Sequence, residues 1–149
     1  MLDEAAEAGQ VLPRALPEIY ENVRDFTVYV DDAGVGGCAA LHIDTAELAE
    51  VRSLVIRHDL RGQGIGQRLL AATVAEAERL GLQRVYTLTR VPTFFLRAGF
   101  QVIDRDALPH KVFKDCLRCP LFPGCDEVAL DRPLAVRNVV ATADAPADQ

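Results

Sequence analysis

The chain has 149 residues, 50% of them hydrophobic and 26% charged, which is the composition of one ordinary globular domain with its own core. A formal net charge of −6 argues against a nucleic-acid-binding surface, because affinity for phosphate backbones comes mainly from clustered Lys and Arg. No apolar run approaches the ~20 residues of a membrane helix, and the acidic, Ala-rich start lacks the features of a signal peptide, so we expect a cytoplasmic protein without membrane or nucleic-acid partners.

The first part of the chain predicts two short helices followed by three strands. The strand at 26–30 is indicated by its β-branched and aromatic residues. The turn Asp31-Asp32-Ala33-Gly34 then predicts a hairpin with the next strand. In chain order, the expected helices cover 2–8 and 17–24, and the expected strands cover 26–30, 38–43 and 51–56.

A long helix and a second sheet segment follow. Apolar and small residues recur at helical spacing up to the stop at Gly81. Strand, helix and the strand at 84–88 form a right-handed crossover, which makes the two strands parallel. A short helix at 93–98, a strand at 100–103 and a disordered acidic tail at 135–149 complete the prediction, so that one domain covers 1–134.

The turn before the long helix is rich in glycine: Arg61-Gly62-Gln63-Gly64-Ile65-Gly66. Glycines let backbone N–H groups approach an anion, and the unpaired N–H groups of a helix start hold phosphate oxygens. A guanidinium beside them suits phosphate as well. Gln67 occupies the place of the third glycine of a dinucleotide fingerprint, and the Gly-Lys-Ser/Thr of a P-loop is absent. The alternative is a turn that only starts a helix.

This turn resembles the Arg/Gln-x-x-Gly-x-Gly/Ala signature of the GNAT acetyltransferase superfamily. Leu54-Val55-Ile56 is similar to that family's central strand, and Leu96-Arg97-Ala98-Gly99-Phe100 is similar to its last short helix and next strand. The resemblance implies an α/β (α+β) fold whose mixed central sheet has a splayed parallel strand pair flanked by helices. It also implies that acetyl-CoA is the co-substrate, with its pyrophosphate on the glycine turn. Val55 and Ile56 would contact the cofactor through main-chain atoms, where an N–H stabilises the oxyanion.

Two features depart from the family pattern. The chain begins inside the usual first helix, so the usual first strand is missing. Many members also carry a Tyr general acid at the place of Phe95. Because a phenyl ring donates no proton, another group must protonate the leaving thiolate.

A narrower resemblance, to short bacterial N-acetylglutamate synthases, covers most of the chain. It rests on Val11-Leu12-Pro13-Arg14, on 18–26, on 49–54, and on the segment from Leu108 to Glu127. These enzymes acetylate the α-amino group of glutamate in arginine biosynthesis, and the resemblance allows for a homodimer. Two alternatives stay open: acetylation of another amino acid, a small amine or a protein N-terminus, and a non-catalytic acetyl-CoA-binding regulatory module.

The attacking amine must lose a proton, which a carboxylate can accept. Glu50, at the start of the central strand, resembles the proposed base; the alternative is a surface carboxylate. Thr89, with Thr87 beside it, could donate a hydrogen bond near the sulfur, although a β-branched strand residue is the simpler interpretation.

Glutamate needs cations for its two carboxylates. Arg14 resembles the substrate-binding arginine of the family's first loop, and Arg52, Arg90 and Lys111 are looser candidates. The alternative for each is an ordinary solvated surface charge.

Four thiols remain to be explained. Cys116-x2-Cys119-x5-Cys125 with His110 upstream could hold one zinc ion, although the second spacing does not fit a paired zinc motif. The favoured interpretation is thiols buried in a loop over the substrate. Cys38 is expected to be a plain core residue.

Overall fold

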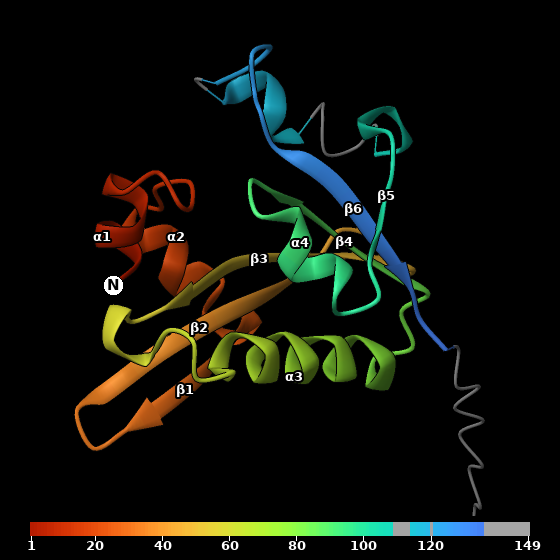
Figure 1. Ribbon diagram of the computed structural model, residues 1–149. Coiled ribbons are helices and arrows are strands. Elements are labelled where there is room, and N and C mark those ends of the chain that lie inside the picture. Colours follow the sequence, from red (N-terminus) through yellow and green to blue (C-terminus); the bar gives the residue numbers. More distant parts are fainter. Residues whose placement is uncertain (109–113, 120, 136–149) are drawn as a thin grey trace, which may run out of the picture.

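The computed structural model describes residues 1–108, 114–119 and 121–135. Within them the chain forms one mixed six-stranded sheet in the order β1-β2-β3-β4-β6-β5 (Figure 1). Neighbouring strands are antiparallel except β3 and β4, which are parallel. The strands are β1 (Phe26–Asp31), β2 (Gly34–Ile43), β3 (Leu48–Ile56), β4 (Arg84–Thr89), β5 (Gln101–Val102) and β6 (Val128–Pro133).

The described residues include four α-helices and four 3₁₀ turns beside the sheet. The helices are α1 (Leu2–Glu7), α2 (Leu16–Glu21), α3 (Ile65–Arg79) and α4 (Pro92–Leu96). The 3₁₀ turns are η1 (Val23–Asp25), η2 (His58–Leu60), η3 (Arg105–Ala107) and η4 (Cys116–Arg118). None of the helices among the described residues has the length and apolar character needed to cross a membrane.

The main core lies between α3 and the sheet. The apolar stripe of α3 buries Leu70, Val74 and Ala77 against strand residues that include Val51 and Val85. This is the helical periodicity that predicted the element. The opposite face of the sheet carries α1, whose Ala5 packs on Cys38 and Val55. Residues of β3 therefore alternate between the α3 side and the α1 side.

The parallel strands β3 and β4 separate at the place where the active site is expected in a sheet with a splayed strand pair. β3 pairs with β4 only from Leu48 to Glu50, opposite Arg84 to Tyr86, although both strands continue beyond that point. On its other side, toward β2, β3 carries a bulge. Between the pairs Cys38–Val55 and Ala40–Arg52, two residues of β3 lie opposite a single residue of β2. Ser53, in the bulge, has φ 55°. The predicted splayed pair is confirmed.

Some predicted bounds were wrong. β6 was not predicted at all, yet it lies between β4 and β5. The strand expected at 100–103 is only Gln101–Val102, and the helix expected at 17–24 ends at Glu21 before a 3₁₀ turn. In the described part of the chain no strand precedes α1, and β1 forms one edge of the sheet. The predicted tail lies outside the described residues from 136 onward.

Candidate active site

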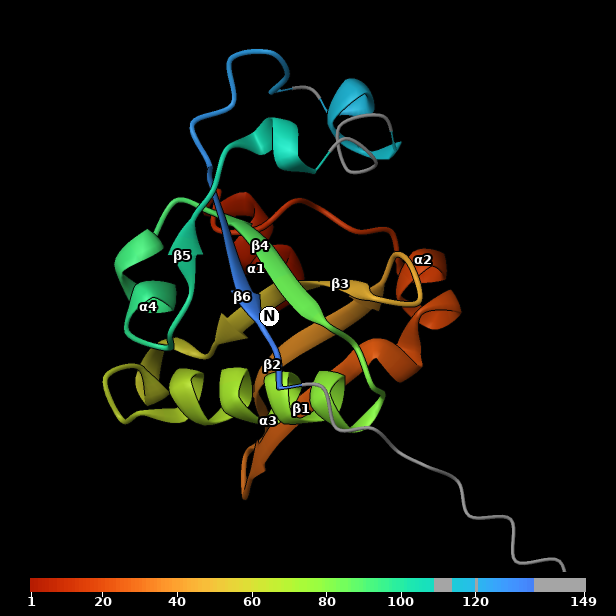
Figure 2. The same cartoon turned by 90° about the vertical axis from the view of Figure 1, so that its right-hand side faces the viewer.

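A cavity opens in the gap between the splayed strands. Its floor consists of β3 from Glu50 to Leu54 and of β4 from Thr87 to Thr89. The segment between α1 and α2, residues at α4 and the described residues between β5 and β6 form its walls; in Figures 1 and 2 these last residues lie at the end of the sheet remote from α3. The wall residues include Gln10, Val11, Leu12, Arg14, Val91, Phe95, Arg105, Asp115, Cys116, Cys119, Phe122, Cys125 and Glu127.

Glu50 is the buried carboxylate of this cavity. Its relative exposure is 5%, and its Oε2 lies 3.8 Å from Nη1 of Arg52. Both residues belong to the face of β3 opposite α3, because Ala49 and Val51 between them pack with α3 in the main core. A carboxylate that lines the cavity is placed to accept a proton from a bound amine.

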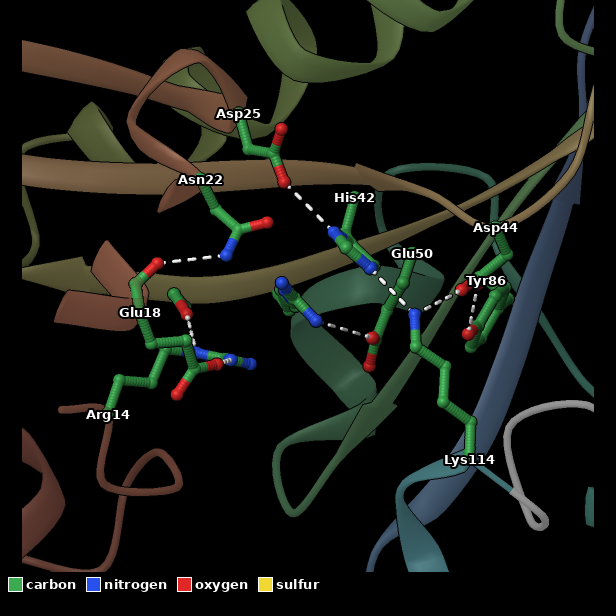
Figure 3. A network of polar contacts seen from close by, with 11 residues as sticks. Arg14, Glu18, Asn22, Asp25, His42, Asp44, Glu50, Tyr86 and Lys114 are labelled. Atoms are coloured by element: carbon green, nitrogen blue, oxygen red, sulfur yellow. Dashed lines mark hydrogen bonds and ion pairs between the residues drawn. The ribbon is translucent and has the colours of Figure 1, made fainter. Parts of the chain in front are cut away.

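Arg14 enters the cavity from the segment between α1 and α2. Its Nε donates to Ser53 Oγ at 3.2 Å, and its Nη1 donates to Glu18. The side chain of Asn22 in turn donates to the Glu18 carbonyl at 2.8 Å (Figure 3). The guanidinium is therefore fixed at the cavity, because the bulge of β3 supplies one partner and α2 supplies the other.

The glycine turn has the geometry of an anion cradle. Gly62 and Gly64 have φ 76° and 78°, and a Cβ on either would meet nothing within 4 Å. Gly64 immediately precedes α3 and provides no side-chain cap to its first N–H groups. These groups are thus available to phosphate oxygens.

Gly66 also has a packing role, and its predicted contact with the cofactor stays a prediction. A Cβ there would lie 3.3 Å from the ring of Phe94, so the absence of a side chain lets α3 approach α4 closely. Its own N–H belongs to the first turn of α3, whose N–H groups have no partner within the helix.

Arg61 folds back over the start of the turn. Its Nε donates to the Ile56 carbonyl at 3.3 Å and its Nη2 donates to Gln10 at 3.1 Å, while Gln63 donates to the Asp59 carbonyl at 3.0 Å. These contacts fix the turn between β3 and α3.

The comparisons with known proteins bear on this arrangement. The model of the acetyltransferase (GNAT) domain matches residues 22–102, which is more than half of the chain. The chain belongs to the GNAT acetyltransferase family. An uncharacterised N-acetyltransferase of Chlorobaculum tepidum is 36% identical over 129 residues, covering 87% of this chain and 83% of that protein.

Two further relatives carry more specific names. An amino-acid acetyltransferase of Mycobacterium tuberculosis is 36% identical over 115 residues, covering 74% of this chain and 66% of that protein. The crystal structure of N-acetylglutamate synthase from Neisseria gonorrhoeae with coenzyme A and N-acetyl-glutamate is similar with a TM-score of 0.80 at 27% identity; the similarity covers 90% of this chain but only 31% of that one. The predicted fold, acyltransferase activity and acetyl-CoA co-substrate of the GNAT family are confirmed.

Val55 and Ile56, the predicted main-chain contacts of the cofactor, follow the bulge of β3. Their side chains pack in the core, Val55 toward α1 and Ile56 toward α3. Both pair with β2 through Cys38 and Gly37. Because the ladder to β4 stops at Glu50, main-chain groups of β3 beyond that residue face the gap, and their predicted contact with the thioester stays a prediction.

Thr89 and Phe95 line the GNAT cavity. Thr89 is 8% exposed, and its Oγ1 accepts the Val91 N–H at 3.0 Å, which is compatible with donation of the hydroxyl hydrogen to another group. Phe95 packs edge-to-face on Phe94 and Phe100, with ring centroids 5.1 and 5.4 Å apart. The position of the usual Tyr is thus filled by a core ring.

Arg90 and Arg105 each bind a residue of the segment just before β6, which lies beside the cavity. Arg90 does not line it: its Nη1 donates to the Gly9 carbonyl and its Nε to Asp126, both at 2.6 Å. This contact holds the pKa of Asp126 below its usual value. Arg105, which the sequence did not single out, donates to the Glu127 carbonyl at 2.7 Å and does line the cavity. Its neighbours in sequence, Asp104 and Asp106, make it look like an ordinary surface charge.

The cysteines line the cavity without forming a metal site in the described part of the chain. Cys116, Cys119 and Cys125 form no disulfide, and no three His, Cys, Asp or Glu side chains among the described residues are placed to hold a metal ion. The zinc interpretation therefore has no support from these residues. His110, its fourth predicted ligand, and Lys111, a candidate for substrate binding, lie outside the described residues.

Proposed function

We propose that this GNAT enzyme acetylates the α-amino group of an amino acid, and that L-glutamate is its substrate, as in the first step of arginine biosynthesis. The observation that carries the proposal is the buried Glu50 in a cavity with Arg14 and Arg52, within the gap of the splayed strands. The relatives named amino-acid acetyltransferases support it.

The chemistry follows from the positions of the side chains. Glu50 accepts a proton from the ammonium of the amino acid, directly or through one water, and the neutral amine attacks the thioester carbon. N–H groups of β3 at the gap stabilise the oxyanion. Thr89 donates a hydrogen bond toward the leaving sulfur, because Phe95 cannot.

The substrate carboxylates are assigned to the guanidinium groups. Arg14 presents a planar fork that grips a carboxylate with two parallel hydrogen bonds, and Arg52 adds a second cation beside Glu50. Such an arrangement turns the amine of the substrate toward Glu50 and the thioester.

A second candidate is an amino acid with a neutral side chain, such as glutamine. Asp115 and Glu127 also line the cavity, and Arg14 already contacts Glu18. These carboxylates oppose a second negative charge on the substrate and accept hydrogen bonds from an amide.

The deciding experiment measures release of the CoA thiol with glutamate, glutamine and aspartate offered separately. We expect glutamate to give the highest kcat/KM. A higher value for glutamine selects the second candidate. Turnover with small amines or N-terminal peptides but with none of the three amino acids overturns the amino-acid proposal and leaves the acetyltransferase assignment in place.

A further inference from the structure

A second cavity lies beside the active-site cavity. The two cavities share wall residues, so they lie next to each other. The shared residues include Arg14, Arg52 and Asp115, whereas Asn22, His42 and Lys114 line the second cavity alone.

His42 connects the second cavity to Glu50. The two residues face each other across the antiparallel pair of β2 and β3. Directly opposed residues point to the same face of the sheet with Cβ atoms ~4.5–5.5 Å apart, and Figure 3 shows both side chains on that face. The imidazole is therefore within reach of the Glu50 carboxylate, directly or through one water.

Asp25 orients the imidazole. Its Oδ2 lies 2.9 Å from His42 Nδ1, so we assign the hydrogen to Nδ1, which donates to the carboxylate. Nε2 is then the acceptor, and it lies 2.9 Å from the Lys114 ammonium, which donates to it. An acceptor nitrogen thus points into the second cavity.

Lys114 has another acceptor within reach. Its ammonium is 3.5 Å from Asp44 Oδ1, and its side chain is half exposed. If Lys114 binds Asp44 alone, Nε2 is uncovered. Asp44 also accepts the hydroxyl of buried Tyr86 at 2.6 Å; burial, with the carboxylates of Glu50 and Asp44, raises the pKa of that hydroxyl and keeps it a donor.

We propose that His42, oriented by Asp25, removes the proton that each turnover leaves on Glu50. The inference rests on the proposed role of Glu50 as base. The O–H bond of the protonated Glu50 breaks as an N–H bond forms at His42 Nε2, and Asp25 stabilises the imidazolium. Nε2 then releases the proton to water in the second cavity, which restores both groups. Among the described residues, the titratable or charged side chains around His42 in this process include Glu18, Asp25, Asp44, Glu50, Arg14, Arg52, Tyr86, Lys114, Asp115 and Cys119.

The first test replaces the proton acceptor. In His42→Ala, kcat falls about tenfold or more, because water must accept the proton directly. KM for the amino acid and the affinity for acetyl-CoA change less than twofold. Imidazole added to His42→Ala restores kcat in proportion to its neutral form, a response that lost packing would not give. The control is His58→Ala, whose side chain is exposed on η2 and keeps the parental kcat without imidazole dependence.

The second test removes the orienting carboxylate. Asp25→Asn weakens the imidazole as a base, so the acidic half-point of the kcat profile moves to lower pH by about one unit. Parental kcat in His42→Ala, absence of imidazole rescue, or an unchanged profile in Asp25→Asn overturns the proposal.

These assays use whichever amino acid the parent acetylates fastest, so a change of substrate does not affect them. If the parent acetylates none, the proposed function fails by itself, and NMR decides the relay. The His42 imidazole resonances of the parent and of Glu50→Gln then titrate at different pH if the two groups are coupled, and coinciding curves overturn the relay.

Discussion

Arg14 is the side chain with the most defined position among the proposed substrate contacts. It is 16% exposed and has partners on two elements, Ser53 in β3 and Glu18 in α2. A guanidinium held in this way has lost its conformational freedom before the substrate arrives, which favours tight binding of a carboxylate.

Arg14→Ala should therefore lower kcat/KM for the amino acid by an amount equivalent to roughly 2–5 kcal/mol, because it removes a charged, partly buried contact. Acetyl-CoA affinity should change little, and Arg14→Lys should restore activity only in part. Steady-state kinetics with both substrates varied provides the measurement. Arg24→Ala, at an exposed position on η1, is the control. Equal kinetics for Arg14→Ala and the parent would remove Arg14 from the substrate site.

The buried thiol of Cys38 should be chemically unreactive in the folded protein. Burial raises the pKa of its thiol to about 11, and the thiol donates to the Ser53 carbonyl at 3.5 Å. At pH 8.5 nearly all of it stays protonated, so it should resist iodoacetamide in the folded protein, while the partly exposed Cys119 and Cys125 react. Peptide mass spectrometry reads each site separately. Labelling of Cys38 as fast as Cys125 would show that the site is open.

At the level of elements, the two ends of α3 offer a matched pair of substitutions. Gly64 precedes the helix and Gly81 follows it; their φ angles are 78° and 77°, and neither would meet another atom within 4 Å if it carried a Cβ. A side chain at either position incurs the same backbone strain. Only Gly64 lies beside the N–H groups assigned to the pyrophosphate.

We expect Gly64→Val and Gly81→Val to lower the melting temperature by similar amounts, and only Gly64→Val to weaken acetyl-CoA binding, by tenfold or so. Calorimetric titration of the folded variants measures the affinity. Equal affinities in both variants would mean that the turn does not hold the pyrophosphate.

Elements with strong local signals were predictable from the sequence. The apolar period of α3 and the glycines at both of its ends define that helix without any other part of the chain. β6 escaped prediction because Asp131, Arg132 and Pro133 make it look like a loop; its strand character comes from pairing with β4 and β5. The bulge at Ser53 was equally hidden, since nothing about a serine signals a positive φ.

The site was predictable where it lies next to such signals. Glu50 and Arg14, which both line the cavity, were named through a resemblance that covers their segments, and their roles stay predictions. Arg105, Asp25 and His42 were missed, because each comes to its site through a contact between segments far apart in sequence. Contacts between distant segments of the chain cannot be inferred from a single sequence.

At the scale of the whole molecule, stability should depend on pH through Arg57. Its guanidinium bonds Asp31 at 2.6 Å and Asp59 at 2.7 Å, which holds the pKa of both carboxyls below the usual value. The folded state then binds fewer protons than the unfolded one. The resulting stabilisation is complete above the unfolded carboxyl pKa, about 4, and is lost as pH falls through the lowered values.

Arg57→Gln should thus melt at a lower temperature than the parent at pH 7, and the difference should shrink below pH 4. Thermal unfolding at pH 7, 5 and 3 provides the measurement, with the exposed Arg79→Gln as control. A difference that stays constant over this range would assign the effect to packing rather than to charge.

The position of β6 has a consequence for the order in which the protein can form during synthesis. The last strand lies inside the sheet and is the sole neighbour of β5 among the described strands. While residues 128–133 are still within the ribosome, β4 is an open edge and the segment that covers the cavity is attached at one end only. A nascent chain can therefore assemble the sheet from β1 to β4 with α3, but a closed acetyl-transfer site arises only after residues 128–133 have left the ribosome. Chains stalled before β6 would expose β4 to pairing with other chains, and are those on which we expect chaperones to act.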